Sequence, residues 1–230
     1  MFPLRDDNPT RRTPYLTILL IVVNVLVFIY EFIQPDQGQR IAMQFGFIPV
    51  EFTQGVELTP HAYFPPIGTM FTSMFLHGSW MHLIGNMLYL WIFGDNCEDL
   101  LGPIWFILFY LLSGIAAVLL FVAFGPNTEV PLIGASGAVS GVLGLYALKY
   151  PRARVMTMIM LGFFIRMVWV PAMVVLGIWF LMQLLFAFVS TANEAAGGVA
   201  YMAHVGGFLV GLLAALIVRR PETTGQSPRW

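Results

Sequence analysis

Charged residues are scarce in this chain. They make up 10% of its 230 residues, whereas 58% of the residues are hydrophobic and the mean hydropathy is +0.79. A soluble domain carries about 25% charged residues, so the deficit indicates a surface that faces a lipid bilayer. The net charge of −1 also lacks the basic excess that is typical of nucleic-acid-binding proteins, and we expect no nucleic-acid partner.

Disulfide-forming and metal-binding residues are scarce as well. Cys97 is the single cysteine, which excludes an internal disulfide framework. The four histidines form no HExxH motif and no cysteine pair accompanies them, so the sequence gives little support to a metal site. We therefore expect no metal and no other cofactor.

Long apolar runs are what the chain has instead, and a helix needs about 20 such residues to cross a bilayer. Four runs are strongly apolar, and two weaker stretches contain polar residues or many small ones. The first run follows a basic start without a small-x-small cleavage site, so we interpret it as a retained span. The chain is predicted to be an all-α membrane protein, a bundle of six transmembrane helices over residues 14–33, 78–94, 103–124, 131–150, 167–189 and 199–218.

The basic residues decide between six spans and four. With six spans, 10 of the 11 basic residues lie inside and only Arg40 lies outside. With four spans, Lys149, Arg152 and Arg154 would share the side of Arg40, which breaks the positive-inside rule. Six spans place both termini in the cytoplasm, and the inside segments are residues 1–13, 95–102, 151–166 and 219–230. Residues 14–219 then form the membrane domain between cytoplasmic tails over residues 1–13 and 220–230.

Two segments fit none of the predicted spans. Val155–Ile165 is apolar but has only 11 residues, and we interpret it as an interfacial or loop segment on the inner face. The outer loop Gln34–Gly68 contains five prolines and scattered aromatic residues, and we expect it to lie partly in the outer interface.

Polar residues within the predicted spans gather at one depth. Ionisable side chains are costly in a membrane and usually face a partner or a water-filled cavity. His82, Ser136 and His204 lie four or five residues from the outer ends of three separate helices, roughly 6–8 Å below the outer boundary. Asn86 follows His82 by four positions and shares its helix face. The common layer favours a single site.

These residues have the chemistry of a nucleophilic catalyst. A serine hydroxyl is a weak nucleophile until an adjacent base takes its proton, and a neutral His204 can act as that base for Ser136. Glycines and alanines around both residues let their helices approach closely enough for a hydrogen bond. Because no acidic residue lies in a span core, we expect a dyad, with His82, Asn86 and the backbone N–H of Ser136 as oxyanion donors.

Each motif also has a non-catalytic explanation. A Gly-x-Ser-Gly sequence is common by chance, and small residues serve helix packing in many membrane proteins. A membrane histidine can belong to a transporter, although the chain lacks the acidic residues and paired half-helices typical of one. The lack of intramembrane aspartate excludes an aspartyl membrane protease. We interpret Asn24 and Gln183 as residues that hydrogen-bond between helices.

Three motifs together are specific for one family: His82-x-x-x-Asn86, Gly134-Ala-Ser136-Gly137 and Ala203-His204-Val-Gly-Gly207. By these motifs, over about residues 12–220, the chain resembles the rhomboid family of intramembrane serine proteases. The resemblance implies a dyad of Ser136 and His204, with His82 and Asn86 at the oxyanion. It also implies hydrolysis of peptide bonds in or near transmembrane segments of other membrane proteins, which are the expected substrates. His77 matches a position usually taken as structural.

The chain departs from the family pattern at three places. Residues 66–68 stand where a Trp-Arg pair is often found in the outer loop. Ser140 stands where some members carry an aromatic residue that stacks on the histidine, and Glu98 lacks the basic neighbour often found there. None of these changes removes a catalytic atom.

The resemblance leaves one rival activity open. A proteolytically inactive rhomboid-like protein would bind membrane clients without cleaving them, and the presence of Ser136, His204, His82 and Asn86 counts against it. We expect a serine endopeptidase of the cell inner membrane.

Overall fold

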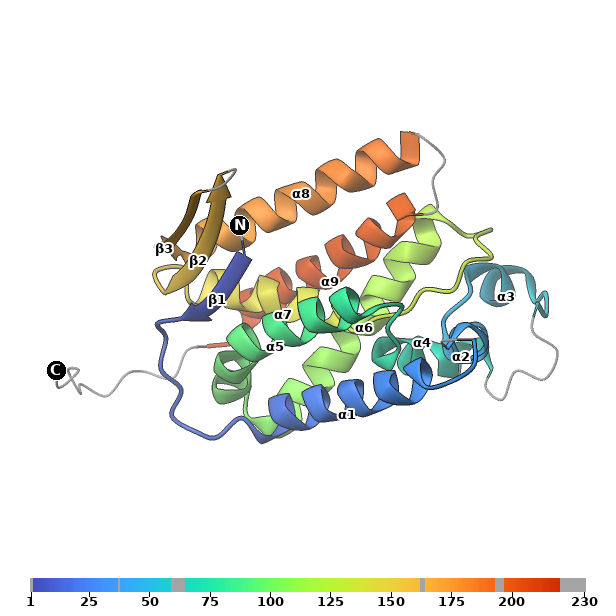
Figure 1. Ribbon diagram of the computed structural model, residues 1–230, viewed down its shortest axis with the longest axis horizontal. Coiled ribbons are helices and arrows are strands. Elements are labelled where there is room, and N and C mark those ends of the chain that lie inside the picture. Colours follow the sequence, from blue (N-terminus) through green and yellow to red (C-terminus); the bar gives the residue numbers. More distant parts are fainter. Residues whose placement is uncertain (1, 37, 59–64, 162–163, 193–196, 220–230) are drawn as a thin grey trace, which may run out of the picture.

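The structure is a computed structural model that describes residues 2–36, 38–58, 65–161, 164–192 and 197–219. Within these ranges, six helices of 14 or more residues follow the predicted order (Figure 1). They are α1 (Tyr15–Phe32), α5 (Trp80–Leu101), α6 (Pro103–Phe124), α7 (Ser136–Lys149), α8 (Ala172–Ala192) and α9 (Gly197–Ile217). The predicted tail over residues 220–230, with Arg220 and Arg229, lies outside the described residues.

Four of these helices are long and apolar enough to cross a membrane. Among the residues that the structure describes, they are α1, α6, Ala172–Val189 in α8 and Ala200–Ile217 in α9. Large apolar side chains on them, such as Leu112 and Leu181, are more than half exposed, as expected for surfaces that face lipid tails. The chain is therefore a multi-pass membrane protein.

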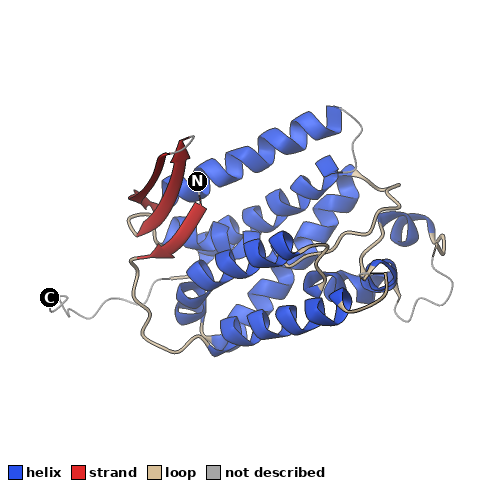
Figure 2. Ribbon diagram, in the orientation of Figure 1, coloured by secondary structure: helices blue, strands red, loops and turns tan. Residues whose placement is uncertain are grey.

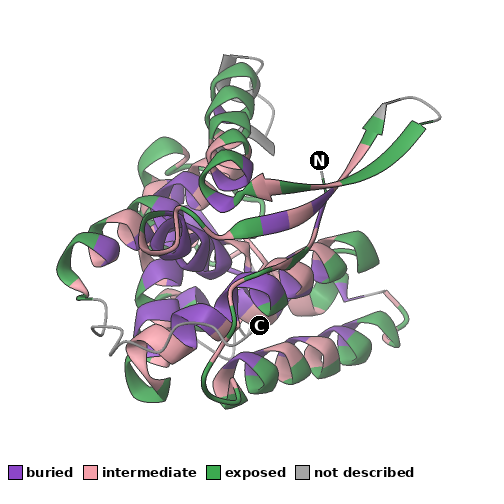
Figure 3. Cartoon of the chain, turned by 90° about the vertical axis from the view of Figure 1, so that its left-hand side faces the viewer, coloured by how far each residue is buried: buried purple, intermediate pink, exposed green. Residues whose placement is uncertain are grey.

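Helix α7 lies at the centre of the bundle. Its residues from Gly137 to Ala147 are all buried, and it packs against α5, α6, α8 and α9. Figure 3, which views the bundle from the end that carries the strands, shows buried residues gathered at the centre and exposed residues around them. The low hydropathy of this segment reflects small residues that contact other helices rather than lipid.

Three of the predicted inside segments meet at one end of the bundle. Asp7 forms an ion pair with Arg154 at 2.7 Å, and the side chain of Asn8 hydrogen-bonds with that of Asn96. Arg40 lies in α2 (Gln39–Phe45), at the opposite end (Figure 1). The segments that the positive-inside rule grouped together are therefore neighbours in space.

A three-stranded antiparallel sheet occupies this end, which the sequence did not predict (Figure 2). Its strands are β1 (Phe2–Asp6), β2 (Arg154–Leu161) and β3 (Phe164–Pro171), in the order β1-β2-β3. Val155–Ile165, which was expected to be an interfacial or loop segment, is not a loop, because most of these residues form a β-hairpin. The bundle is consequently not all-α, β1 is not a free tail, and the helix expected from Met167 begins at Ala172.

Packing explains why the apolar segment pairs as strands. Val155 and Thr157 are two positions apart, so both point to the same face of β2, and both are fully buried. On β1, the carboxylate of Asp6 accepts a hydrogen bond from the hydroxyl of Tyr146 in α7. Burial raises the pKa of the Asp6 carboxyl, so this group keeps its proton to a higher pH than an exposed aspartate.

The outer loop contains short helices that pack on the segment ahead of α7. They are α2, α3 (Pro49–Gln54), α4 (Pro66–Thr72) and the 3-10 helix η1 (Ser73–Phe75). Between α2 and α3, Phe47 is fully buried and exchanges backbone hydrogen bonds of 3.0 and 2.8 Å with Leu132. The loop thereby supports the chain that leads to Ser136.

Glu98 caps α1 from a neighbouring helix. Its carboxylate accepts hydrogen bonds from the backbone N–H groups of Leu16 and Thr17, at 3.0 and 2.8 Å, and from the Thr17 hydroxyl at 2.8 Å. The first N–H groups of a helix have no intrahelical acceptor, and a negative charge there is stabilising. This contact gives Glu98 partners in place of the basic residue that the family pattern suggested.

Substitution Glu98→Ala should lower the free energy of unfolding by about 2–3 kcal/mol, because it leaves buried donors of α1 unpaired. The midpoint of thermal unfolding of the detergent-solubilised protein measures the loss. Asp99→Ala is the matched control, since the hydrogen bond that Asp99 accepts from the Arg11 backbone is 3.2 Å long and lies at an exposed position. Equal midpoints for the two variants would contradict the capping role.

Candidate active site

Ser136 is the first residue of α7, and its side chain contacts His204 of α9. The Oγ atom of Ser136 and the Nε2 atom of His204 lie 2.9 Å apart, which is a hydrogen-bonding distance. The fold brings the two residues together across a sequence separation of 68. The two predicted members of the dyad are thus in direct contact.

The chain bends sharply just before Ser136. Gly134 has a φ of +126°, a conformation that side-chain-bearing residues rarely adopt, and its N–H donates to the carbonyl oxygen of Ser73 at 2.8 Å. A β-carbon on Gly134 would lie 2.7 Å from the imidazole ring of His82 and 3.5 Å from Oγ of Ser136. The glycine therefore permits both the bend and the close approach of His82 to this segment.

His82 and Asn86 reach the site from α5. The ring of His82 packs against Gly134, two residues before Ser136. Asn86 is buried, and its Nδ2 atom has no hydrogen-bond partner among the residues that the structure describes. A buried donor without a partner is costly, which suits a group whose acceptor arrives with a substrate. No hydrogen bond between described residues joins either side chain to Ser136, so their role at the oxyanion stays a prediction.

His204 has a second hydrogen-bond partner on α8. Its Nδ1 atom lies 2.8 Å from Oε1 of Gln183, and the ring of Trp179 lies beside the same imidazole, with centroids 6.1 Å apart. Gln183 does hydrogen-bond between helices, as its sequence context predicted, but its partner is the candidate base. The sequence did contain one clue to this partner, which is the predicted depth of Gln183 in the membrane. Gln183 lies six residues before the predicted outer end at Val189, close to the layer of Ser136.

A comparison with known protein families identifies the family of this chain. The sequence model of the rhomboid domain matches residues 67–221, more than half of the chain. The chain belongs to the rhomboid family. The matched region contains Ser136, His204, His82 and Asn86, and it confirms the resemblance that their motifs indicated.

Curated relatives share parts of this rhomboid. It is 32% identical over 152 residues to Rhomboid protein 1, mitochondrial, of Saccharomyces cerevisiae, and this match covers 61% of this chain and 39% of the relative. It is 32% identical over 105 residues to Rhomboid-like protein 11, chloroplastic, of Arabidopsis thaliana, and this match covers 44% of this chain and 37% of the relative. It is 34% identical over 87 residues to Presenilin-associated rhomboid-like protein A, mitochondrial, of Danio rerio, and this match covers 37% of this chain and 23% of the relative. The matches thus span less than two fifths of the length of these relatives.

The second serine of α7 does not face the histidine in this rhomboid. The hydroxyl of Ser140 donates to the carbonyl oxygen of Ser136 at 2.6 Å, and the residue is buried. Ser140 therefore bonds back to its own helix. The aromatic ring beside His204, which some members place at the position of Ser140, comes here from Trp179 of α8.

His77 packs against His82, one of the predicted site residues of this rhomboid. Its buried ring packs edge-on against His82, with centroids 5.1 Å apart, and its backbone N–H donates to the carboxylate of Glu31 at 3.2 Å. Within the described ranges it makes no hydrogen bond to Ser136 or His204. This placement agrees with the structural role that the family resemblance implied for His77.

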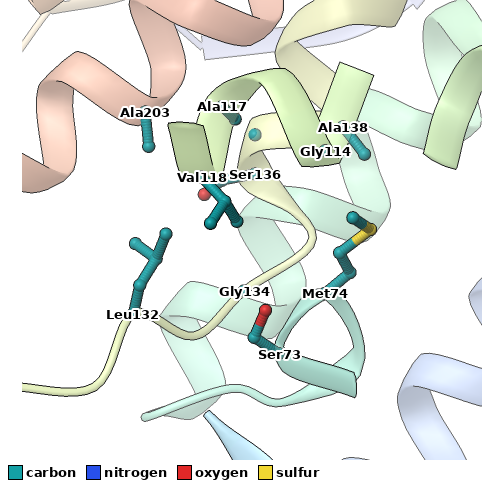
Figure 4. Close-up of a pocket in the computed structure, with 11 residues that line it drawn as sticks. Ser73, Met74, Gly114, Ala117, Val118, Leu132, Gly134, Ser136, Ala138 and Ala203 are labelled. Carbon is teal, nitrogen blue, oxygen red and sulfur yellow. The ribbon is translucent and has the colours of Figure 1, made fainter. Parts of the chain in front are cut away.

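A small cavity lies beside the nucleophile candidate of this rhomboid (Figure 4). It is formed by η1, α6, the start of α7 and α9, and its walls carry no charged side chain. Small residues predominate among those that line it, which are Ser73, Met74, Gly114, Ala117, Val118, Leu132, Gly134, Ser136, Gly137, Ala138 and Ala203. The space next to Ser136 therefore suits a small uncharged group.

Proposed function

We propose that this rhomboid is an intramembrane serine endopeptidase that cleaves other membrane proteins in or near their transmembrane segments. The observation that carries the proposal is the 2.9 Å contact between Oγ of Ser136 and Nε2 of His204. Family membership supports it, because rhomboid proteins are generally intramembrane serine proteases.

In the proposed reaction, Nε2 of His204 takes the hydroxyl proton while Oγ of Ser136 attacks the carbonyl carbon of the substrate. His204 then gives this proton to the leaving amine, the C–N bond breaks, and an ester between Ser136 and the substrate remains. A water molecule loses a proton to His204 and attacks the ester. Collapse of the second intermediate releases the new carboxyl terminus and returns the proton to Ser136.

Three donors are available for the negative oxygen of each intermediate. The backbone N–H of Ser136 has no intrahelical acceptor, because Ser136 is the first residue of α7. Asn86 has an unpaired Nδ2 atom, and the His82 ring lies against Gly134. Donors that are in place before charge develops stabilise the transition state without reorganisation.

A fluorophosphonate probe tests the proposed activity directly. The purified protein in detergent micelles should gain the mass of one phosphonyl group, located on the peptide that contains Ser136, and should cleave a transmembrane model substrate. A protein that binds such substrates but gains no adduct and cleaves none of them would instead be an inactive rhomboid-like client-binding protein.

Substitutions Asn86→Ala and His82→Ala should each reduce kcat by about 10²–10³-fold, since one oxyanion donor is lost while the others remain. Steady-state cleavage of a fluorogenic transmembrane peptide measures the effect. Asn24→Ala is the matched control, because Asn24 is a buried asparagine that hydrogen-bonds the Leu20 carbonyl within α1. Wild-type kcat in Asn86→Ala would remove this residue from the proposed oxyanion site.

We also propose that all six long helices cross the membrane, with both termini in the cytoplasm and the site near the outer face. The separation of the basic residues supports this orientation, and we assign the protein to the cell inner membrane. The names of the relatives assign those proteins to mitochondria and a chloroplast, so an organellar membrane is the second candidate. Reporter fusions after Arg40 and Arg154 should report opposite sides of the membrane.

A further inference from the structure

His204 is held at both of its ring nitrogens. Nε2 lies 2.9 Å from the Ser136 hydroxyl, and Nδ1 lies 2.8 Å from the amide oxygen of Gln183. A neutral imidazole carries one N–H donor and one acceptor nitrogen, whereas an amide oxygen only accepts. The contact to Gln183 therefore puts the proton on Nδ1 and leaves the Nε2 lone pair directed at Ser136.

We propose that Gln183 is a positioning residue of the dyad, which holds His204 in the tautomer and orientation that accept the Ser136 proton. The inference rests on the proposed protease activity and adds a third residue to it. Which ring nitrogen of a histidine carries the proton is set by the hydrogen bond that the other nitrogen makes. Without an acceptor at Nδ1, the two neutral tautomers compete, and one of them turns an N–H toward the nucleophile.

The position of Gln183 on α8 supports this role. Leu176, Trp179 and Gln183 follow one another at helical spacings of three and four, so they share one face of α8. Leu176 is fully buried and Trp179 lies beside the His204 ring, whereas Leu181 on another face is 63% exposed. The one amide of this apolar helix thus points into the protein, toward the imidazole.

A neutral amide also suits a base buried in a membrane. A carboxylate at this position would have to leave water, which costs far more than burial of an amide. An amide supplies an acceptor in the same direction without a charge. Cysteine proteases with a Cys-His-Asn arrangement likewise orient their histidine with an amide side chain.

Few charged groups near His204 influence the protonation of its imidazole. Among the described residues, His82 from α5 is close enough to act electrostatically on His204, and the Tyr201 ring from α9 lies edge-on to it with centroids 6.2 Å apart. The groups that hydrogen-bond with the imidazole or lie beside it, Ser136, Gln183 and Trp179, are uncharged. A charge introduced at position 183 should therefore change the protonation of His204 directly.

Two substitutions of Gln183 separate positioning from packing. Gln183→Met keeps the length of the side chain but removes the acceptor, and kcat should fall about 10–100-fold with little change in KM. Gln183→Glu keeps an acceptor oxygen and adds a negative charge that favours the protonated imidazole. Because the protonated ring cannot act as a base, the acidic limb of the kcat/KM profile should move about 1–3 pH units higher.

Leu181→Met, an exposed substitution on the same helix, is the control and should match the wild type in kcat, pH profile and thermal midpoint. Wild-type kcat in Gln183→Met overturns the positioning role. So does a Gln183→Glu variant that loses as much kcat as Gln183→Met while its acidic limb is unchanged, because the acceptor oxygen is kept there. A loss of kcat that only follows a lower thermal midpoint overturns it as well. Ser136→Ala is measured in parallel: if cleavage depends on Ser136 while the Gln183 variants behave like wild type, the protease assignment stands and only the role of Gln183 fails.

Discussion

Ser136→Ala is expected to lower the cleavage rate of a transmembrane substrate by about 10⁴–10⁶-fold. The proposed oxyanion donors remain in this variant, but no other hydroxyl of the described residues makes a hydrogen bond with His204. The nearest hydroxyl on α7, that of Ser140, donates to the Ser136 carbonyl at 2.6 Å. Cleavage by the purified protein in proteoliposomes, followed over days, measures the residual rate.

The matched control for this variant is Ser140→Ala, which removes a hydroxyl one helical turn away and should keep kcat near the wild-type value. His204→Ala should be as inactive as Ser136→Ala, and the double variant no worse, because members of a catalytic unit are not additive. Cleavage by Ser136→Ala together with loss of activity in Ser140→Ala would place the nucleophile at Ser140 instead.

Gly211→Val is expected to prevent stable packing of α9 against α7, at a cost of about 3 kcal/mol or more. A β-carbon on Gly211 would overlap the carbonyl oxygen of Gly141 and lie 2.7 Å from the backbone nitrogen of Leu145. Both atoms belong to the backbone of α7, so no side-chain rotation relieves the overlap. The yield of monodisperse protein in detergent and its thermal midpoint measure the effect.

Gly177→Val on α8 is the control for the packing variant, since a β-carbon on Gly177 has no neighbour within 4 Å among the described residues. Both substitutions place the same side chain in an apolar helix. Equal yields and midpoints for the two variants would contradict the requirement for close approach of α7 and α9.

The contact between Ser136 and His204 was predictable from the sequence because two independent constraints indicated it. Charge asymmetry predicted the direction of each span, and that direction predicted one common depth for Ser136, His204 and His82. Small residues then indicated which helices approach closely, and α7 and α9 do so in the structure. The weak hydropathy of α7 was informative for the same reason, since a helix surrounded by other helices needs few large apolar residues.

The sheet and the role of Gln183 needed the structure. An apolar run of 11 residues has no period that distinguishes an interfacial helix or loop from a strand, and the partner of β2 on one side is β1, about 150 residues earlier. Gln183 was visible as a polar residue in an apolar helix, but in many membrane proteins a glutamine side chain forms a hydrogen bond that only stabilises the packing of two helices. Only its 2.8 Å contact with Nδ1 of His204 separates the two roles.

The pairing of β1 with β2 has a consequence for the assembly of the protein. β1 is synthesised first, yet its partner follows only after residues 7–153, which contain α1, α5, α6 and α7. The N-terminal segment therefore has no strand partner until these four helices have been synthesised. If residues 1–8 are removed, the backbone N–H and C=O groups of β2 form an uncovered strand edge, a template for association with another chain. Shortening this end should therefore favour aggregation during synthesis, while the contact between Ser136 and His204 stays in place.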